Sequence, residues 1–295
     1  MQDDMLDRFL RSSQLLKASW DVLRSDRELV VLPVLSVIAT MTAMLVLVMS
    51  MRTAGVDLRA FQHRSVVLAG QNDPTIYVCI FIAYLVTYFI AFFFNTALVG
   101  AALERLKGGD PTVGSALALA SHRIGPIFGY ALVSATVGIL MALIVERIGG
   151  ILGRLLGIGF SLAWTVATFL VVPILAAEGV GPIRAIAESS ALLRKTWGEN
   201  LVGNVGISLA MSAISFAILI FGCASGVVAF REGYAELLPL ILAGTMVLVV
   251  ISALLGSALR GIYVAAVYYY AVVGEPPWSF QKSALRGTFM KKREY

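Results

Sequence analysis

Apolar residues run through the chain in six long blocks that are separated by polar stretches. Each block is long enough to cross the roughly 30 Å hydrocarbon core of a bilayer, which takes about 20 apolar residues in a helix. The pattern therefore predicts six transmembrane helices. They cover approximately residues 29–51, 75–103, 124–145, 151–177, 201–230 and 237–273.

The last two blocks are longer than a bilayer requires, so we expect these helices to tilt, protrude or break. Gly256 and Gly261 are the expected places for a bend in the sixth. Two small-xxx-small motifs, Gly153–Gly157 and Gly222–Gly226, predict close helix packing, within one chain more often than between chains.

Composition agrees with a membrane protein. Hydrophobic residues make up 59% of the 295 residues and charged residues 14%, against about 45–50% and 25% in soluble domains. A soluble fold of this length could not hide so much apolar surface, so it must face lipid. We expect an all-α membrane protein with a single membrane domain, residues 1–295, and the lipid bilayer as its first partner.

Both ends of the chain differ from the six-span bundle, residues 29–273. Residues 1–28 predict an amphipathic helix, with Leu16, Trp20 and Leu23 on one face and charged residues largely elsewhere. Such a helix either lies in the membrane interface or packs on the protein's own surface, and the sequence favours neither. Residues 274–295 form a basic C-terminal tail.

The distribution of Lys and Arg predicts the orientation in the membrane. Sixteen of these residues lie in the two termini and in the connections 104–123 and 178–200, and six lie on the opposite side. Positive charge is retained on the cytoplasmic side, so both termini are expected in the cytoplasm. An even number of spans requires the same. The expected location is the cell's inner (plasma) membrane.

An internal repeat is suggested by a corner motif. Gly-x-x-Pro occurs at Gly108–Pro111, Gly179–Pro182 and Gly274–Pro277, each time at the end of an even-numbered span. Gly ends a helix in the left-handed conformation, and Pro favours the first turn of the next helix. Residues 12–20 and 189–197 also match, with five of nine positions identical. We expect a threefold repeat of two spans plus a cytoplasmic amphipathic helix.

The sequence lacks the residues that are typical of several function classes. Cys79 and Cys223 lie inside apolar blocks rather than in a disulfide framework, and His63 and His122 have no ligand-spaced partner. No phosphate loop, nucleophile elbow or catalytic carboxylate pair is present. The expectation is a protein that is not an enzyme, holds no cofactor or metal, and binds no nucleic acid despite its net charge of +5.

Three segments carry a family resemblance: 19–33, 94–111 and 172–197. They resemble an uncharacterised six-span family of bacterial and archaeal integral membrane proteins. The last segment is also similar to the membrane domain attached to some glycerophosphoryl diester phosphodiesterases. This chain has no phosphodiesterase catalytic domain, so the resemblance implies a membrane module without that activity.

Polar residues at similar depth in three spans form the candidate site. Asn95, Thr165 and Arg260 lie thirteen or fourteen residues before the three corner glycines. A charge in the middle of a span costs about 2.5 kcal/mol or more, so Arg260 should face protein or water. Arg260 has either a functional or a structural role, and the sequence does not distinguish between them.

The polar layer favours a pathway for a small solute or ion as the leading function. A membrane scaffold or assembly factor that organises lipids or partner proteins is the alternative. A lipid-modifying enzyme is a third, without catalytic groups to support it. Beyond lipid, the expected partner is a second copy of the chain or another membrane protein.

The charge count makes a testable prediction of topology. After both native cysteines are replaced, we expect cysteines introduced at Ser13 and Met290 to be shielded from impermeant thiol reagents in intact cells. A cysteine introduced at Arg64 should react. Permeabilised cells serve as the control, in which all three positions should be labelled. Labelling of either terminus from outside would contradict the arrangement.

Overall fold

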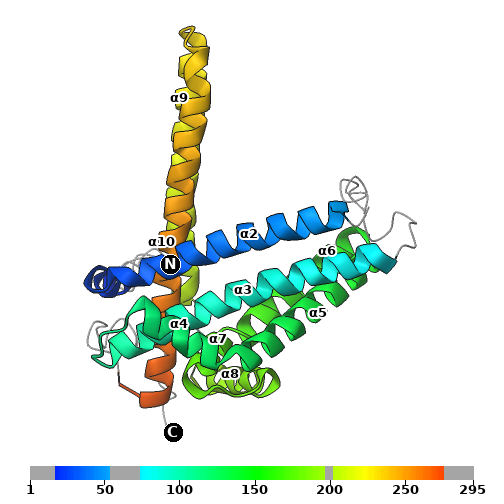
Figure 1. Ribbon diagram of the computed structural model, residues 1–295, viewed down its shortest axis with the longest axis vertical. Helices are drawn as coiled ribbons and strands as arrows, with labels where there is room; N and C mark the ends of the chain where they lie inside the picture. The colour runs from blue at the N-terminus through cyan, green and yellow to red at the C-terminus, as the bar shows by residue number, and fades with distance from the viewer. Residues whose placement is uncertain (1–16, 54–73, 197–201, 276–295) are drawn as a thin grey trace, which may run out of the picture. The chain divides into compact units, whose positions relative to one another are not determined.

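The computed structural model describes residues 17–53, 74–196 and 202–275 (Figure 1). Every regular element in these ranges is helical: residues 17–25, η1 (Arg27–Val30), α2 (Val31–Thr53), α3 (Pro74–Leu106), α4 (Val113–His122), α5 (Ile124–Ile148), α6 (Gly150–Ala167), α7 (Val171–Glu178), α8 (Pro182–Thr196), α9 (Val202–Arg231), η3 (Ala235–Leu237) and α10 (Leu238–Val273).

Within the described residues, six helical stretches are long and apolar enough to cross a membrane, which confirms the six predicted spans. They are Glu28–Thr53, Val78–Leu106, Ile124–Ile148, Gly150–Glu178, Met211–Arg231 and Ala235–Val273. The expected bend in the sixth span does not interrupt its helix. α10 is one continuous helix of 36 residues through Gly256 and Gly261, about 54 Å long at 1.5 Å per residue.

The chain divides into two compact units, each assembled from separate stretches of sequence. The first contains Met1–Pro33, Ala101–Thr112 and Arg194–Tyr295, and the second contains Val34–Gly100 and Val113–Leu193. A single membrane domain over residues 1–295 stays a prediction. The two units are described separately below.

In the second unit, aromatic side chains join α3 to α5. The rings of Phe92 and Tyr130 are 4.4 Å apart between centroids, and Phe89 meets Phe128 edge to face. α5 and α6 are separated by Gly149 alone, which has φ +63°. Close packing follows this turn, because a Cβ on Gly153 would lie 2.6 Å from the carbonyl oxygen of Val145.

The fourth span contains a break that the apolar pattern does not reveal. α6 ends at Ala167 and α7 begins at Val171. Pro173 explains the interruption, since a proline inside a helix lacks an N–H and its ring clashes with the carbonyl four residues earlier. The N–H of Leu170 that loses its helical partner donates instead to Oγ of Ser189 on α8, at 3.1 Å. Both residues are fully buried.

All three corner glycines adopt the predicted left-handed conformation. Their φ angles are +89° at Gly108, +64° at Gly179 and +80° at Gly274. α8 begins at Pro182, as expected, whereas α4 begins two residues after Pro111. The segment after the third corner lies outside the described residues, so the threefold repeat stays a prediction.

The N-terminal helix is described only from residue 17 onward. Ala18, Val22 and Leu23 are buried, and Trp20 is 45% exposed. This part of the helix therefore packs on the protein through one face while its tryptophan stays open. The predicted residues before Lys17 lie outside the described range.

In the first unit, α9 and α10 form an antiparallel hairpin (Figure 1). The contacts between the two helices follow one constant register. Gly222 packs directly on Thr245, and Oγ of Ser215 lies 2.8 Å from Oγ of Ser252. Small residues of this kind let two helix backbones approach closely in lipid. We call this line of contacts the hairpin seam; it confirms that the Gly222–Gly226 motif packs within the chain.

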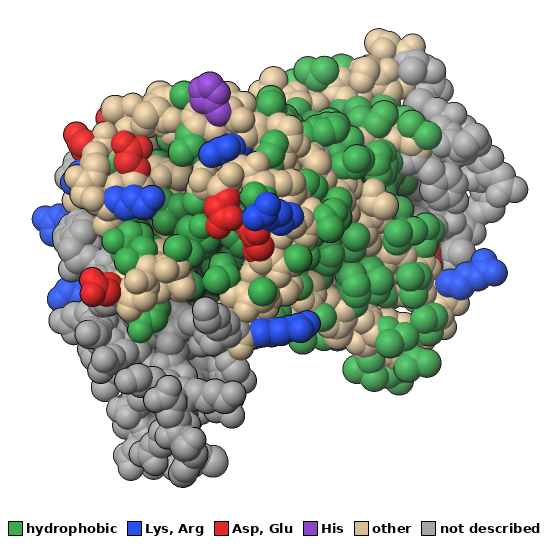
Figure 2. Space-filling model, turned by 90° about the horizontal axis from the view of Figure 1, so that it is seen from below, with side chains coloured by type: hydrophobic (Ala, Val, Ile, Leu, Met, Phe, Trp, Pro, Cys, Tyr) green, Lys and Arg blue, Asp and Glu red, His purple; other side chains and the backbone are tan. Residues whose placement is uncertain are grey.

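Large apolar side chains cover the hairpin outside its seam. Phe216, Phe221 and Phe230 on α9 are 64%, 74% and 67% exposed, and Leu240 and Met246 on α10 are 71% and 66% exposed. Figure 2 views the molecule from below, and open apolar side chains are visible on that face as well. Such a surface belongs in lipid or against another apolar helix.

The hairpin seam can be tested with two matched substitutions on α9. We expect Gly222→Ala to destabilise the protein by about 1–3 kcal/mol through overpacking, because the new Cβ would lie 2.9 Å from Cβ of Thr245. Gly226→Ala is the control, since its Cβ would make an ordinary 3.5 Å contact with Leu238. Both gain the same helix propensity.

Thermal unfolding in detergent distinguishes the two variants. Adding Thr245→Gly should restore the stability lost by Gly222→Ala. Equal melting temperatures for the two alanine variants would contradict the close approach of α9 and α10.

Candidate functional site

The three residues of the predicted polar layer lie in two different units of the structure. Asn95 is half-buried on α3, and Thr165 is exposed on α6, where its hydroxyl donates to the carbonyl oxygen of Ser161 at 2.8 Å. Arg260 is exposed on α10. Asn95 and Thr165 belong to the second unit and Arg260 to the first, so a layer formed by all three stays a prediction. The solute or ion pathway that depends on this layer also stays a prediction.

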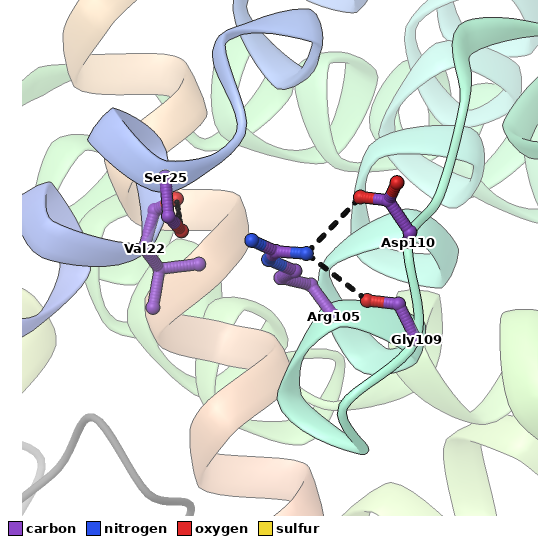
Figure 3. Close-up of polar contacts among 5 residues, drawn as sticks. All are labelled: Val22, Ser25, Arg105, Gly109 and Asp110. Carbon is purple, nitrogen blue, oxygen red and sulfur yellow. Dashed lines mark hydrogen bonds and ion pairs between the residues drawn. The ribbon is translucent and has the colours of Figure 1, made fainter.

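A different polar cluster is formed where α3 ends, in the first unit. Nη1 of Arg105, in the last turn of α3, donates to the carbonyl oxygen of Gly109 at 3.2 Å and to Oδ1 of Asp110 at 3.1 Å (Figure 3). Gly108 supplies the left-handed turn that brings these acceptors back toward the helix. Arg105 therefore clamps the first Gly-x-x-Pro corner onto the end of α3. A cation at this position also suits the negative end of the helix dipole.

Asp26 is a buried carboxyl whose charge interacts with that of Arg105. It lies between the helix 17–25 and η1 and is 7% exposed, and among described residues its Oδ2 has no hydrogen-bond partner. Burial raises the pKa of Asp26 above its usual value, while the N–H of Glu28 and the charge of Arg105 act against this effect. Desolvation outweighs the attraction to Arg105.

The arrangement is suited to holding the first Gly-x-x-Pro corner at the end of α3. Within the described residues, no group of three or more His, Cys, Asp or Glu side chains could hold a metal ion. Cys79 and Cys223 are free, as expected.

Sequence reasoning did not identify the cluster around Arg105 as a site. Asp26 and Asp110 each stand in a segment that carries the family resemblance, at 19–33 and 94–111. The available signal was a cation in the last turn of a span directly before Gly108–Pro111. Nothing in the linear pattern predicted that the charges of Asp26 and Arg105 interact.

The six apolar helices define the class: this is a polytopic α-helical membrane protein. Residues 75–277 match the model of a family described as a family of unknown function, DUF6159. The match covers well over half of the chain, and the protein belongs to that family. No curated protein matches the chain.

The raised pKa of Asp26 predicts how stability depends on pH. The folded protein binds this proton more tightly than the unfolded chain does. The contribution of Asp26 to stability is therefore greatest in acid and declines as the pH rises through its pKa. We expect Asp26→Asn to be more stable than the parent at pH 7. The difference should disappear below about pH 3, where the carboxyl is protonated in both states.

Melting temperatures in detergent across this pH range test the prediction. Asp21→Asn, on the exposed side of the same helix, is the control and should have little effect at any pH. A variant at Asp26 that is less stable than the parent at neutral pH would mean that its attraction to Arg105 outweighs desolvation.

Proposed function

We propose that this protein is a non-enzymatic membrane scaffold that assembles with a second copy of itself through the α9–α10 hairpin. The observation that carries this proposal is the division of small and large residues around α9. Small residues close the hairpin seam, and large apolar residues face outward. A helix so divided can pack closely against its own neighbour and still present a wide apolar face to another helix.

The outward face of α9 that best fits a partner helix lies opposite Gly222. Phe216, Ile220 and Val227 share this side at the spacing of a helical stripe, and they are 64%, 54% and 56% exposed. Because the seam occupies the other side of the helix, these side chains are free to interdigitate with those of a second hairpin. We call these three residues the outer stripe.

A scaffold also agrees with the family resemblance expected from the sequence. The similar membrane domains that accompany some glycerophosphoryl diester phosphodiesterases are joined to an enzyme there. A module of this kind acts beside a partner and needs no reaction of its own. The lipid bilayer is the remaining partner that six apolar helices require.

Self-association in liposomes tests the proposal. Energy transfer between labelled copies should fall at least severalfold in Phe216→Ala/Val227→Ala, because the outer stripe then offers less apolar surface for packing. The matched control is Phe221→Ala/Val228→Ala. It removes the same two side-chain types from another side of α9, where they are 74% and 58% exposed. Energy transfer should survive in the control.

Dilution with unlabelled lipid distinguishes specific association from crowding. A parent protein that stays monomeric at every dilution would overturn the scaffold proposal, as would equal losses in the two double variants. Circular dichroism and a single elution peak in detergent confirm that each variant is folded.

A further inference from the structure

An apolar groove lies where the N-terminal helix meets the hairpin, within the first unit. One cavity of about 340 Å³ is lined by Lys17, Trp20, Met211, Ile214, Ser252, Leu255 and Leu259. A second, of about 390 Å³, is lined by Trp20, Leu23, Arg24, Val30 and Leu255. Trp20 and Leu255 line both, so the two cavities adjoin. Each has the size of a small-molecule site, roughly 300–1,000 Å³.

The chemistry of the groove changes along its length. Between α9 and α10 its walls are almost wholly apolar, from Met211 and Ile214 to Leu259. Toward residues 17–25 it meets Lys17 and Arg24, both exposed, with Trp20 between them. The spacing of these three residues, i, i+3 and i+7, places them on one side of the helix.

The two cations lie just before the first span in the sequence. Arg24 is four residues before the first span, which begins at Glu28. Trp20 is 45% exposed, and tryptophan favours the level of lipid headgroups. Neither Lys17 nor Arg24 forms an ion pair with another described residue. Asp21 shares their exposed side but lines neither cavity.

From this geometry we infer that the groove binds one anionic phospholipid of the bilayer. An acyl chain lies in the cavity between α9 and α10, and the headgroup phosphate lies beside Lys17 and Arg24. Trp20 packs against the glycerol region between them. An apolar slot that ends at two cations matches a ligand with an apolar tail and a negative head. The outer stripe of α9 takes no part, so the site is independent of the proposed self-association.

Fluorescence quenching of Trp20 measures binding at this groove. The variant Trp164→Phe/Trp197→Phe/Trp278→Phe leaves Trp20 as the single tryptophan. It is reconstituted with brominated phosphatidylglycerol or with brominated phosphatidylcholine of the same acyl chains, each diluted in unbrominated phosphatidylcholine. Each cation near the surface favours an anionic lipid by roughly fivefold at low salt. We therefore expect phosphatidylglycerol to bind at least fivefold more tightly.

Two further variants separate the headgroup from the acyl chain. Lys17→Gln/Arg24→Gln should bring the ratio of the two binding constants close to one. Ile214→Phe narrows the cavity and should weaken the binding of both lipids by a similar factor. Arg231→Gln removes an exposed cation at the far end of α9, which lines neither cavity, and should keep the full preference.

Equal quenching by the two lipids in the single-tryptophan protein would overturn the inference. So would a preference that survives Lys17→Gln/Arg24→Gln or is lost in Arg231→Gln. If the double variant does not fold, raising the salt concentration in the single-tryptophan protein replaces it. The preference must then decline, because salt screens charges at an exposed site.

Discussion

The need to satisfy every backbone polar group in a medium without water governs this fold. A continuous helix meets that need internally, and a lipid-exposed break would cost several kcal/mol for each unsatisfied group. The one interruption inside a described span is accordingly buried. Pro173 breaks the fourth span, and the displaced N–H of Leu170 donates to Oγ of Ser189 on α8, a helix of 15 residues that is not one of the six candidate spans. α8 therefore supplies a hydrogen-bond acceptor to the span that precedes it in the sequence.

How much of the structure could be predicted depends on the range over which each signal acts. The spans and the left-handed corner glycines follow from neighbouring residues, and the structure agrees with both. The bond from Leu170 to Ser189 joins residues nineteen apart. Asp26 and Arg105 lie even farther apart in the sequence, and no periodic pattern predicts that their charges interact.

The predicted polar layer depends on the direction of its side chains as well as on their depth, and it stays a prediction. Equal spacing from corner glycines places Asn95, Thr165 and Arg260 at similar depth, but depth does not determine direction. Thr165 turns its hydroxyl to its own helix, as hydroxyl side chains in helices often do. Pattern alone cannot say which way a side chain points when its alternatives are lipid, protein and its own backbone. The bonds from Arg105 to Gly109 and Asp110 are local, whereas the burial of Asp26 depends on tertiary contacts that spacing does not express.

The connection between α5 and α6 has a consequence for biosynthesis. A single residue, Gly149, separates the two helices, so no hydrophilic loop can cross the membrane ahead of the second one. With both termini in the cytoplasm, as the charge distribution predicts, Arg147 and Arg154 on either side of the turn must cross the hydrocarbon on two helices that enter together. From this topology we expect the two helices to be inserted as a pair, after the ribosome has completed both.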